Sequence, residues 1–166
     1  MTPEEKYRIV LSTYPKGVYS IDTIEIRHPL FPETIYWTRE PMGLTATDED
    51  GNILEFNGVN FDISLNDTKN DLDENFLIIL QDLDNAADGL LELIPLDNTD
   101  PIEVIYRAYN SDDLTAPGYG PVKLTALEVT QQKGQLSAVV GATQLNWAQT
   151  GIAYDYDIFP MLRALQ

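Results

Sequence analysis

Cysteine is absent from this sequence of 166 residues, and histidine occurs only once, as His28. Without thiols there are no disulfide bonds, thiolate nucleophiles, iron–sulfur clusters or cysteine zinc sites. A Ser-His-Asp triad would have to use His28, which stands between an expected strand and Pro29 with no serine motif beside it. Gly-x-Ser-x-Gly, His-Glu-x-x-His and Walker motifs are missing as well. We therefore expect His28 to form turn hydrogen bonds, and we expect no catalytic residue.

Basic residues are scarce, because 10 of them stand against 27 acidic ones and leave a formal net charge of −17. Proteins bind phosphate backbones and anionic lipids through Lys and Arg, so we expect no nucleic-acid or membrane partner. No stretch approaches the roughly 18 apolar residues of a membrane span, and the first residues lack the features of a secretory signal. The acidity indicates either plain solubility or a partner, or cations, of opposite charge.

Residues 1–17 predict a short helix. Thr2 is a suitable N-cap, Pro3 suits the first helical position, and Glu5 completes a capping box with Thr2. The Pro-x-Gly sequence that follows is a typical helix end. The apolar residues fall on one helical stripe, which consists of Tyr7, Val10, Leu11 and Tyr14.

After residue 19 the pattern changes to that of strands. Residues 59–65 alternate apolar and polar side chains, which is typical of a half-buried strand. Residues 48–52 contain Asp50-Gly51 and predict a hairpin turn, with Gly51 supplying a positive φ. The other runs that predict strands are 23–27, 34–38, 44–47, 53–56, 76–80, 102–109, 122–131 and 135–140, the last two joined as a hairpin.

A second helix is predicted over 84–94, where apolar residues recur at helical spacing between the N-cap Asp84 and Pro95. The sequence shows no internal repeat and no linker, so we expect residues 1–166 to form a single domain. Strands interleaved with two short helices predict a mainly β (α+β) fold, an antiparallel β-barrel or sandwich with helical decoration.

Two acidic segments contain oxygen ligands of the kind that Ca²⁺ prefers, but neither has the spacing of an EF-hand loop. We interpret both as solvated turns and expect no metal and no cofactor. Paired carboxylates for glycoside hydrolysis remain an open alternative among 27 acidic residues. The two segments are Asp48, Asp50 and Asn52, and Asp67, Asp71, Asp73 and Glu74.

Aromatic residues supply a further alternative, an exposed platform for a sugar or a receptor. Aromatic side chains in strands more often pack in a core or an interface, and we interpret these in that way. The candidates are Tyr36, Trp37, Trp147, Tyr154 and Tyr156.

The C-terminal segment, residues 150–166, is unusually apolar for a chain end. It is either a final strand paired into the sheet or an arm that docks on a neighbouring subunit, because aromatic and Met side chains are typical anchors of interfaces. Its candidate interface residues are Tyr154, Tyr156, Ile158, Phe159, Met161 and Leu162.

Several segments together resemble a family of bacteriophage minor tail proteins, long described only as a domain of unknown function. The early strand Ile24–Arg27 ends in His28-Pro29, and the hairpin about Asp50-Gly51 is followed by a strand at 61–65. The helix near 84–94 precedes the strand 103–107, and residues 156–162 are similar to the family's aromatic ending. Met161 stands where the family pattern favours glycine, which leaves the turn of that ending open.

The resemblance covers most of residues 19–163 and implies a structural protein of the virion at the distal tail, made in the host bacterial cytoplasm. It implies assembly with other phage tail proteins, leaves homo-oligomerisation open, and supplies no catalytic residues. A carbohydrate- or receptor-binding module and a tail assembly chaperone are the alternatives.

Overall fold

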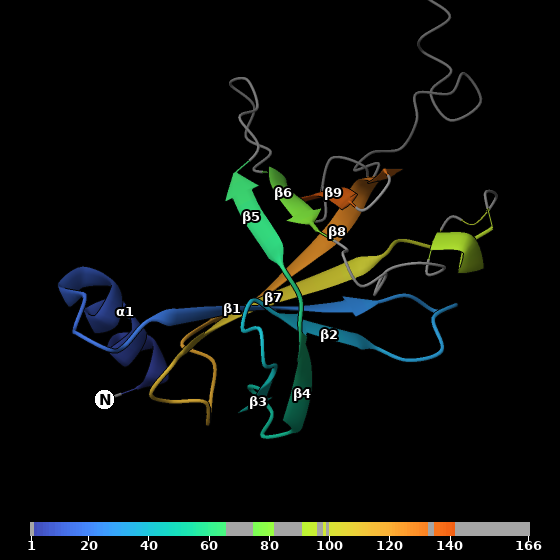
Figure 1. The fold of residues 1–166 in the computed structure, drawn as a ribbon. Coiled ribbons are helices and arrows are strands. Elements are labelled where there is room, and N and C mark those ends of the chain that lie inside the picture. Colours follow the sequence, from blue (N-terminus) through green and yellow to red (C-terminus); the bar gives the residue numbers. More distant parts are fainter. Residues whose placement is uncertain are drawn as a thin grey trace, which may run out of the picture.

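A computed structural model describes residues 2–65, 75–81, 91–95, 98, 100–132 and 135–141. This part of the chain is mainly β, as the sequence predicts (Figure 1). The elements in chain order are α1 (Pro3–Thr13), β1 (Ser20–Arg27), β2 (Ile35–Thr38), β3 (Leu44–Thr47), β4 (Ile53–Gly58), β5 (Phe61–Leu65), β6 (Asn75–Leu80), a 3₁₀ turn (Leu91–Leu93), β7 (Glu103–Asn110), β8 (Tyr119–Gln132) and β9 (Gln135–Gly141).

The nine strands form one mixed sheet in the order β3-β4-β2-β1-β7-β8-β9-β6-β5. Neighbouring strands pair antiparallel except β2 and β4, which are parallel. The 14-residue strand β8 pairs with β7 along its first half and with β9 along its second half. The predicted hairpin of the last two strands is therefore confirmed.

The sheet is not closed into a barrel, so a closed antiparallel barrel was the wrong prediction. Its two ends are β3 and β5, and these strands do not pair with each other. The chain passes directly from β4, the neighbour of the edge strand β3, to β5 at the opposite edge. Val59 and Asn60 form this connection. The amide of Val59 donates to the carbonyl of Thr38 at 2.9 Å, and the amide of Gln81 donates to the carbonyl of Asn60 at the same distance. These two bonds hold the crossing beside both β2 and β6.

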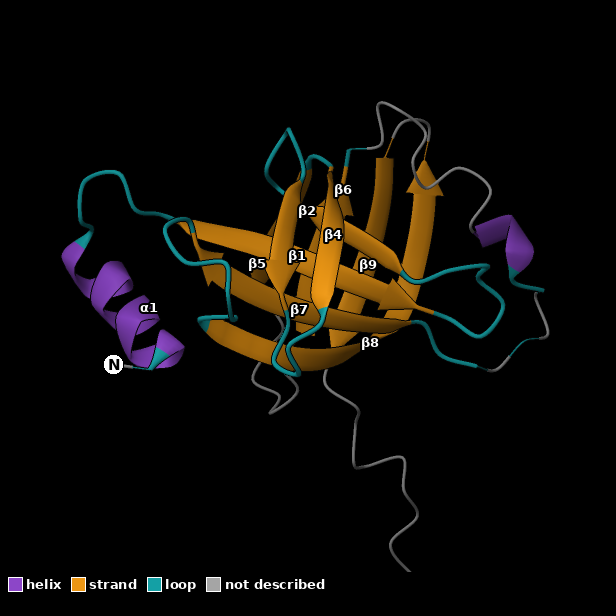
Figure 2. Cartoon of the chain, turned by 90° about the horizontal axis from the view of Figure 1, so that it is seen from below, coloured by secondary structure: helices purple, strands orange, loops and turns teal. Residues whose placement is uncertain are grey.

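One face of the sheet encloses the main core. Figure 2 shows the sheet curving strongly, which lets strands from its two halves contribute to one cluster. Large side chains such as Phe61 and Ile24 are 1% exposed in this core. Burial of such side chains is the main source of stability for the fold. The buried members of the cluster are Ile24, Trp37, Phe61, Ile78, Leu80, Val104, Leu124 and Val140.

The opposite face of β1 and β7 is buried as well, because the β3–β4 hairpin folds over it. Phe56 of β4 packs edge-on against Tyr109 of β7 and Tyr36 of β2, with ring centroids 6.3 and 5.6 Å apart. Tyr109 is fully buried in this second cluster, together with Ile21 and Ala46. Strand β7 is consequently buried on both faces over Val104–Asn110, apart from the half-buried Tyr106.

Helix α1 lies next to the start of β1, beyond the ends of the strands (Figure 1). It begins with the predicted capping box. The amide of Glu5 donates to the hydroxyl of Thr2 at 3.2 Å, and the amide of Thr2 donates to the carboxylate of Glu5 at 2.9 Å. Only half of the predicted apolar stripe is buried. Tyr7 and Val10 face the sheet, whereas Leu11 and Tyr14 are 44% and 82% exposed.

The second predicted helix is not confirmed. Within 84–94 the structure describes 91–94, of which Leu91–Leu93 form a 3₁₀ turn, while 84–90 lie outside the described residues. Strand β8 begins at Tyr119, three residues before the start of the strand predicted at 122–131. In the part of the chain that the structure covers, no helix is both long and apolar enough to cross a membrane.

Candidate functional site

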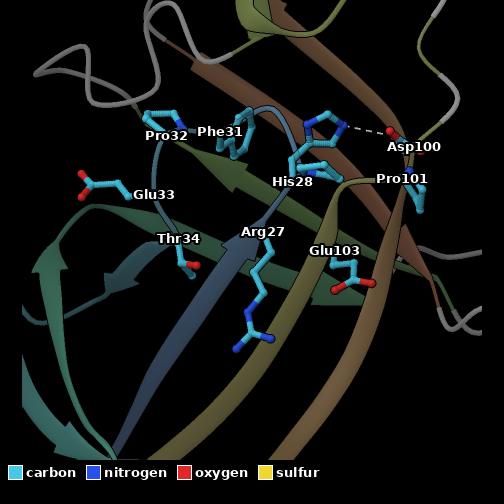
Figure 3. Close-up of a pocket in the computed structure, with 10 residues that line it drawn as sticks. Arg27, His28, Phe31, Pro32, Glu33, Thr34, Asp100, Pro101 and Glu103 are labelled. Atoms are coloured by element: carbon cyan, nitrogen blue, oxygen red, sulfur yellow. Dashed lines mark hydrogen bonds between the residues drawn. The ribbon is translucent and has the colours of Figure 1, made fainter.

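A wide hollow lies where β1 ends and β7 begins. Antiparallel pairing sets Arg27, the last residue of β1, opposite Glu103, the first residue of β7. The chain segments beyond this pair, 28–34 and 100–101, therefore lie together and enclose a cavity of about 510 Å³ (Figure 3). Its lining consists of Arg27, His28, Pro29, Phe31, Pro32, Glu33, Thr34, Asp100, Pro101 and Glu103.

His28 forms the back of this cavity and is 7% exposed. The amide of Leu30 donates to its Nδ1 at 3.2 Å, so Nδ1 carries no proton in this arrangement. The proton is then on Nε2, which donates to the carbonyl of Asp100 at 3.3 Å, a contact across 72 residues of sequence (Figure 3). Both ring nitrogens are used, as the prediction of turn hydrogen bonds for His28 requires.

Prolines and aromatic rings make up much of the cavity wall. The ring of Phe31 packs on the imidazole of His28 with centroids 5.2 Å apart, and the amide of Phe31 donates to the carbonyl of His28 at 3.0 Å. Pro29 and Pro101 fix the backbone next to these contacts, since the proline ring restricts both its own φ and the preceding residue. The result is a rigid turn on either side of the opening.

Three carboxylates border the cavity, from Glu33, Asp100 and Glu103, and all three residues are exposed. Figure 3 shows Glu33 on one side of Arg27 and Glu103 on the other. The guanidinium of Arg27 is bonded to the carboxylate of Glu25, a side chain that is 1% exposed. Because Glu25 neutralises Arg27, the bordering carboxylates give this opening a net negative charge.

A small apolar slot of about 50 Å³ opens next to the cavity and shares Phe31 with it. Its other walls include Ile26, Ile35 and Trp37, which belong to β1 and β2 at the edge of the main core. An acidic opening therefore borders on an apolar one.

A buried ion cluster on the outer face of β1 and β7 is linked to the cavity through Glu25, which is bonded to both Arg27 and Arg107. Arg107 is 3% exposed in its side chain and donates from Nη1 to Glu25 at 2.6 Å. It also forms a two-bond fork with Glu49 of the β3–β4 turn, from Nε at 2.8 Å and from Nη2 at 2.9 Å. Such paired, charge-assisted bonds are strong and fix geometry. They tie the hairpin to the strand that leads from the cavity.

These contacts shift the ionisation of the cluster. Burial lowers the pKa of Arg107, but its bonds to Glu49 and Glu25 outweigh this effect and hold the pKa above its usual range. The same bond from Arg107 lowers the pKa of Glu49. Burial raises the pKa of Tyr109 to about 12. Arg107 and Glu49 are therefore ionised, and Tyr109 is neutral, at ordinary pH.

The calcium-binding alternative at Asp48, Asp50 and Asn52 finds a different explanation in the structure. The carboxylate of Asp48 accepts bonds from the amides of Asp50 and Asn52 at 2.9 and 2.7 Å, and from Nδ2 of Asn52 at 2.9 Å. Burial opposes the charged form, but these bonds prevail and lower the pKa of Asp48. Asp48 thus closes the hairpin turn. No group of three metal-ligating side chains is placed to hold a metal ion within the described ranges.

Other predicted site residues are divided between core and undescribed segments. Trp37 is 4% exposed and belongs to the main core, and Tyr36 is half-buried against Phe56, so neither forms an exposed sugar platform. The remaining predicted residues lie outside the described part of the chain. They are Trp147, Asp67, Asp71, Asp73 and Glu74, and the interface candidates Tyr154, Tyr156, Ile158, Phe159, Met161 and Leu162.

The sequence interpretation missed Glu25, Arg107 and Glu49. Glu25 and Arg107 stand at polar positions of alternating strands, a pattern that predicts a solvated face. The available signal was the pair of opposite charges, one in each of two strands that are otherwise rich in apolar residues. It becomes meaningful only once the hairpin is known to cover that face.

A comparison with protein families shows to which family the chain belongs. The family described as "Domain of unknown function (DUF1833)" matches residues 7–150. This match spans most of the chain, so the protein belongs to that family. It includes all the strands, the cavity and the ion cluster described above. A comparison with curated proteins finds no match.

Proposed function

We propose that this protein is a structural component of a bacteriophage tail tip and acts by assembling with other tail proteins rather than by catalysis. The phage setting is supported by the resemblance of the early strand that ends in His28-Pro29, the hairpin about Gly51 and the strands at 61–65 and 103–107. The structure has each of these strands and the hairpin in the sheet.

The open sheet is the observation that carries the assembly role. Strand β5 pairs with β6 on one side, and no strand pairs with its other side in the part of the chain that the structure covers. An unpaired edge presents free N–H and C=O groups and is a template for another chain. A closed barrel would offer no such edge. A protein that works by assembly needs surfaces of this kind.

In this account the C-terminal segment supplies a second contact, with Tyr154, Phe159 and Leu162 among the anchors. The test compares the full chain with a chain that ends at residue 153 in cells that are assembling phage particles. Mass spectrometry then measures each chain in particles purified on a density gradient. We expect the full chain in the particles and the short chain in the soluble fraction, with an unchanged β-type circular dichroism spectrum.

A matched control keeps the full length and replaces the six apolar interface candidates of 154–162 by serine, which separates the effect of side chains from that of length. Global unfolding of the chain that ends at residue 153 would show that the segment belongs to the core and not to an interface. Absence of the full chain from the particles would contradict the structural role and favour an assembly chaperone, with glycan or receptor binding behind it.

A further inference from the structure

We propose that the cavity between the end of β1 and the start of β7 binds the side chain of a lysine or arginine presented by a partner protein. This inference adds a specific contact to the proposed assembly role. It rests on that role only in the assumption that the bound cation belongs to a partner protein. The chemistry of the cavity stands by itself.

The form of the cavity suits a long side chain with a charged end. Its volume of about 510 Å³ exceeds what one such side chain needs, so a short segment of backbone can enter with it. Phe31, Pro32 and Pro101 offer apolar wall for the methylene stem of a lysine or arginine. The face of an aromatic ring also attracts a cation electrostatically.

The charges of the cavity favour a cation. Glu33, Asp100 and Glu103 surround it, and none of their carboxylates forms an ion pair with any described residue. Arg27 is the one arginine or lysine in the lining, and its guanidinium is already bonded to the carboxylate of Glu25. An entering ammonium or guanidinium therefore meets carboxylates that form no ion pair with a described residue, whereas an entering anion would be repelled.

The spacing of these carboxylates favours a side chain over a metal ion. No three acidic or histidine side chains converge closely enough to hold a metal anywhere in the described ranges. His28, the other conventional ligand, has both nitrogens in hydrogen bonds. Separated carboxylates around a wide opening match a cation that carries several N–H donors on a flexible stem.

The charge balance of the chain points to the same kind of partner. Of the 10 basic residues, Lys6, Arg27, Arg39 and Arg107 already pair with acidic side chains of the chain itself. The surplus of acid is therefore not compensated within the molecule. A basic partner surface gains affinity and association rate from this field.

The test uses the full chain and an acetylated hexalysine peptide, titrated at constant pH and low, fixed ionic strength. His28 is the only histidine, so its ring gives a single set of NMR signals that reports from the cavity wall. We expect the peptide to shift these signals in a saturable way. Glu33→Gln combined with Glu103→Gln should weaken binding about five-fold, as expected for the loss of two exposed ion pairs.

The matched control is Glu4→Gln combined with Asp50→Asn, which removes two exposed charges from α1 and the β3–β4 turn, neither of which lines the cavity. It should weaken binding less than about two-fold. Equal losses in both double variants would show diffuse attraction and overturn the proposal, as would unshifted His28 signals at saturation. Spermine binding as tightly as the peptide would show a small-cation site and overturn protein docking. Because no particle is involved, failure here is separate from failure of the tail-tip role.

Discussion

Arg107 is the residue whose removal should damage the fold most. It is almost fully buried and is bonded to two carboxylates, one of which belongs to the buried Glu25. Arg107→Ala leaves the buried carboxylate of Glu25 with the half-exposed Arg27 as its remaining ion-pair partner, and we expect a loss of about 3 kcal/mol in the free energy of unfolding. Urea denaturation at pH 7 measures this loss.

The control is Arg39→Ala, since Arg39 is half exposed and pairs with Asp22 at the surface. Exposed ion pairs contribute little, and the loss should stay below about 1 kcal/mol. If Arg107→Ala cost no more than Arg39→Ala, the buried cluster would not have the role described for it.

The contribution of Glu49 to the free energy of unfolding should depend on pH. Its pKa is lower in the folded protein than in the unfolded chain, because it accepts two bonds from Arg107. Its contribution is therefore complete above the unfolded pKa of roughly 4.3 and is lost as the pH falls through the lower folded pKa.

We expect Glu49→Gln to lower the free energy of unfolding by about 1–2 kcal/mol at pH 7. This difference from the wild type should shrink as the pH is lowered below about 5. Urea denaturation across this range tests the sign, with Glu55→Gln, an exposed glutamate of β4, as the control that stays close to wild type at every pH. A difference that grows in acid would contradict the account.

For single residues, the sequence predicted correctly those contacts that join near neighbours in the chain. The capping box of Thr2 and Glu5 and the turn at Gly51 are local, and both are present. Gly51 has φ of 86°, which a side chain rarely adopts. The bond of His28 to Asp100 and that of Glu25 to Arg107 join residues 72 and 82 positions apart. Periodicity carries no information on such pairs.

Among the elements, α1 has the most distinctive attachment. Tyr7 packs against the backbone of Gly118, and a Cβ at residue 118 would lie 2.7 Å from the Cβ of Tyr7. The hydroxyl of Tyr7 also lies 3.0 Å from that of Ser20. The ring of Tyr7 also stacks on that of Tyr119 with centroids 6.2 Å apart, so the attachment of the helix centres on Tyr7 and its close approach to Gly118.

We therefore expect Gly118→Ala to displace α1 while the sheet stays folded. Amide hydrogen exchange should accelerate in residues 7–13 and remain unchanged in β7. Ser12→Ala, on the exposed side of the helix, is the control and should leave exchange unchanged. Unchanged exchange in Gly118→Ala would show that the helix tolerates the added methyl group.

Element types followed from the sequence more readily than their arrangement. Alternation in 59–65 and the apolar run at 76–80 predicted β5 and β6 correctly. The crossing from β4 to β5 and the parallel pairing of β2 with β4 were not predicted, since consecutive strands usually pair as hairpins. An open, mixed sheet therefore stands where an antiparallel barrel or sandwich was expected.

For the molecule as a whole, the open sheet, the acidic cavity and most of the surplus of negative charge belong to the segment that matches the family. Residues 151–166 lie beyond that match and contain the apolar interface candidates. We infer that the matched segment forms a platform and that the C-terminal residues add a further contact, which is an arrangement suited to a part of a larger assembly.

Immuno-electron microscopy tests this central claim most directly. Antibody raised against the chain is applied to purified phage particles from the source, with pre-immune serum as the control. We predict label at the distal end of the tail. Particles free of label, with the protein abundant only in the soluble lysate, would contradict the structural role.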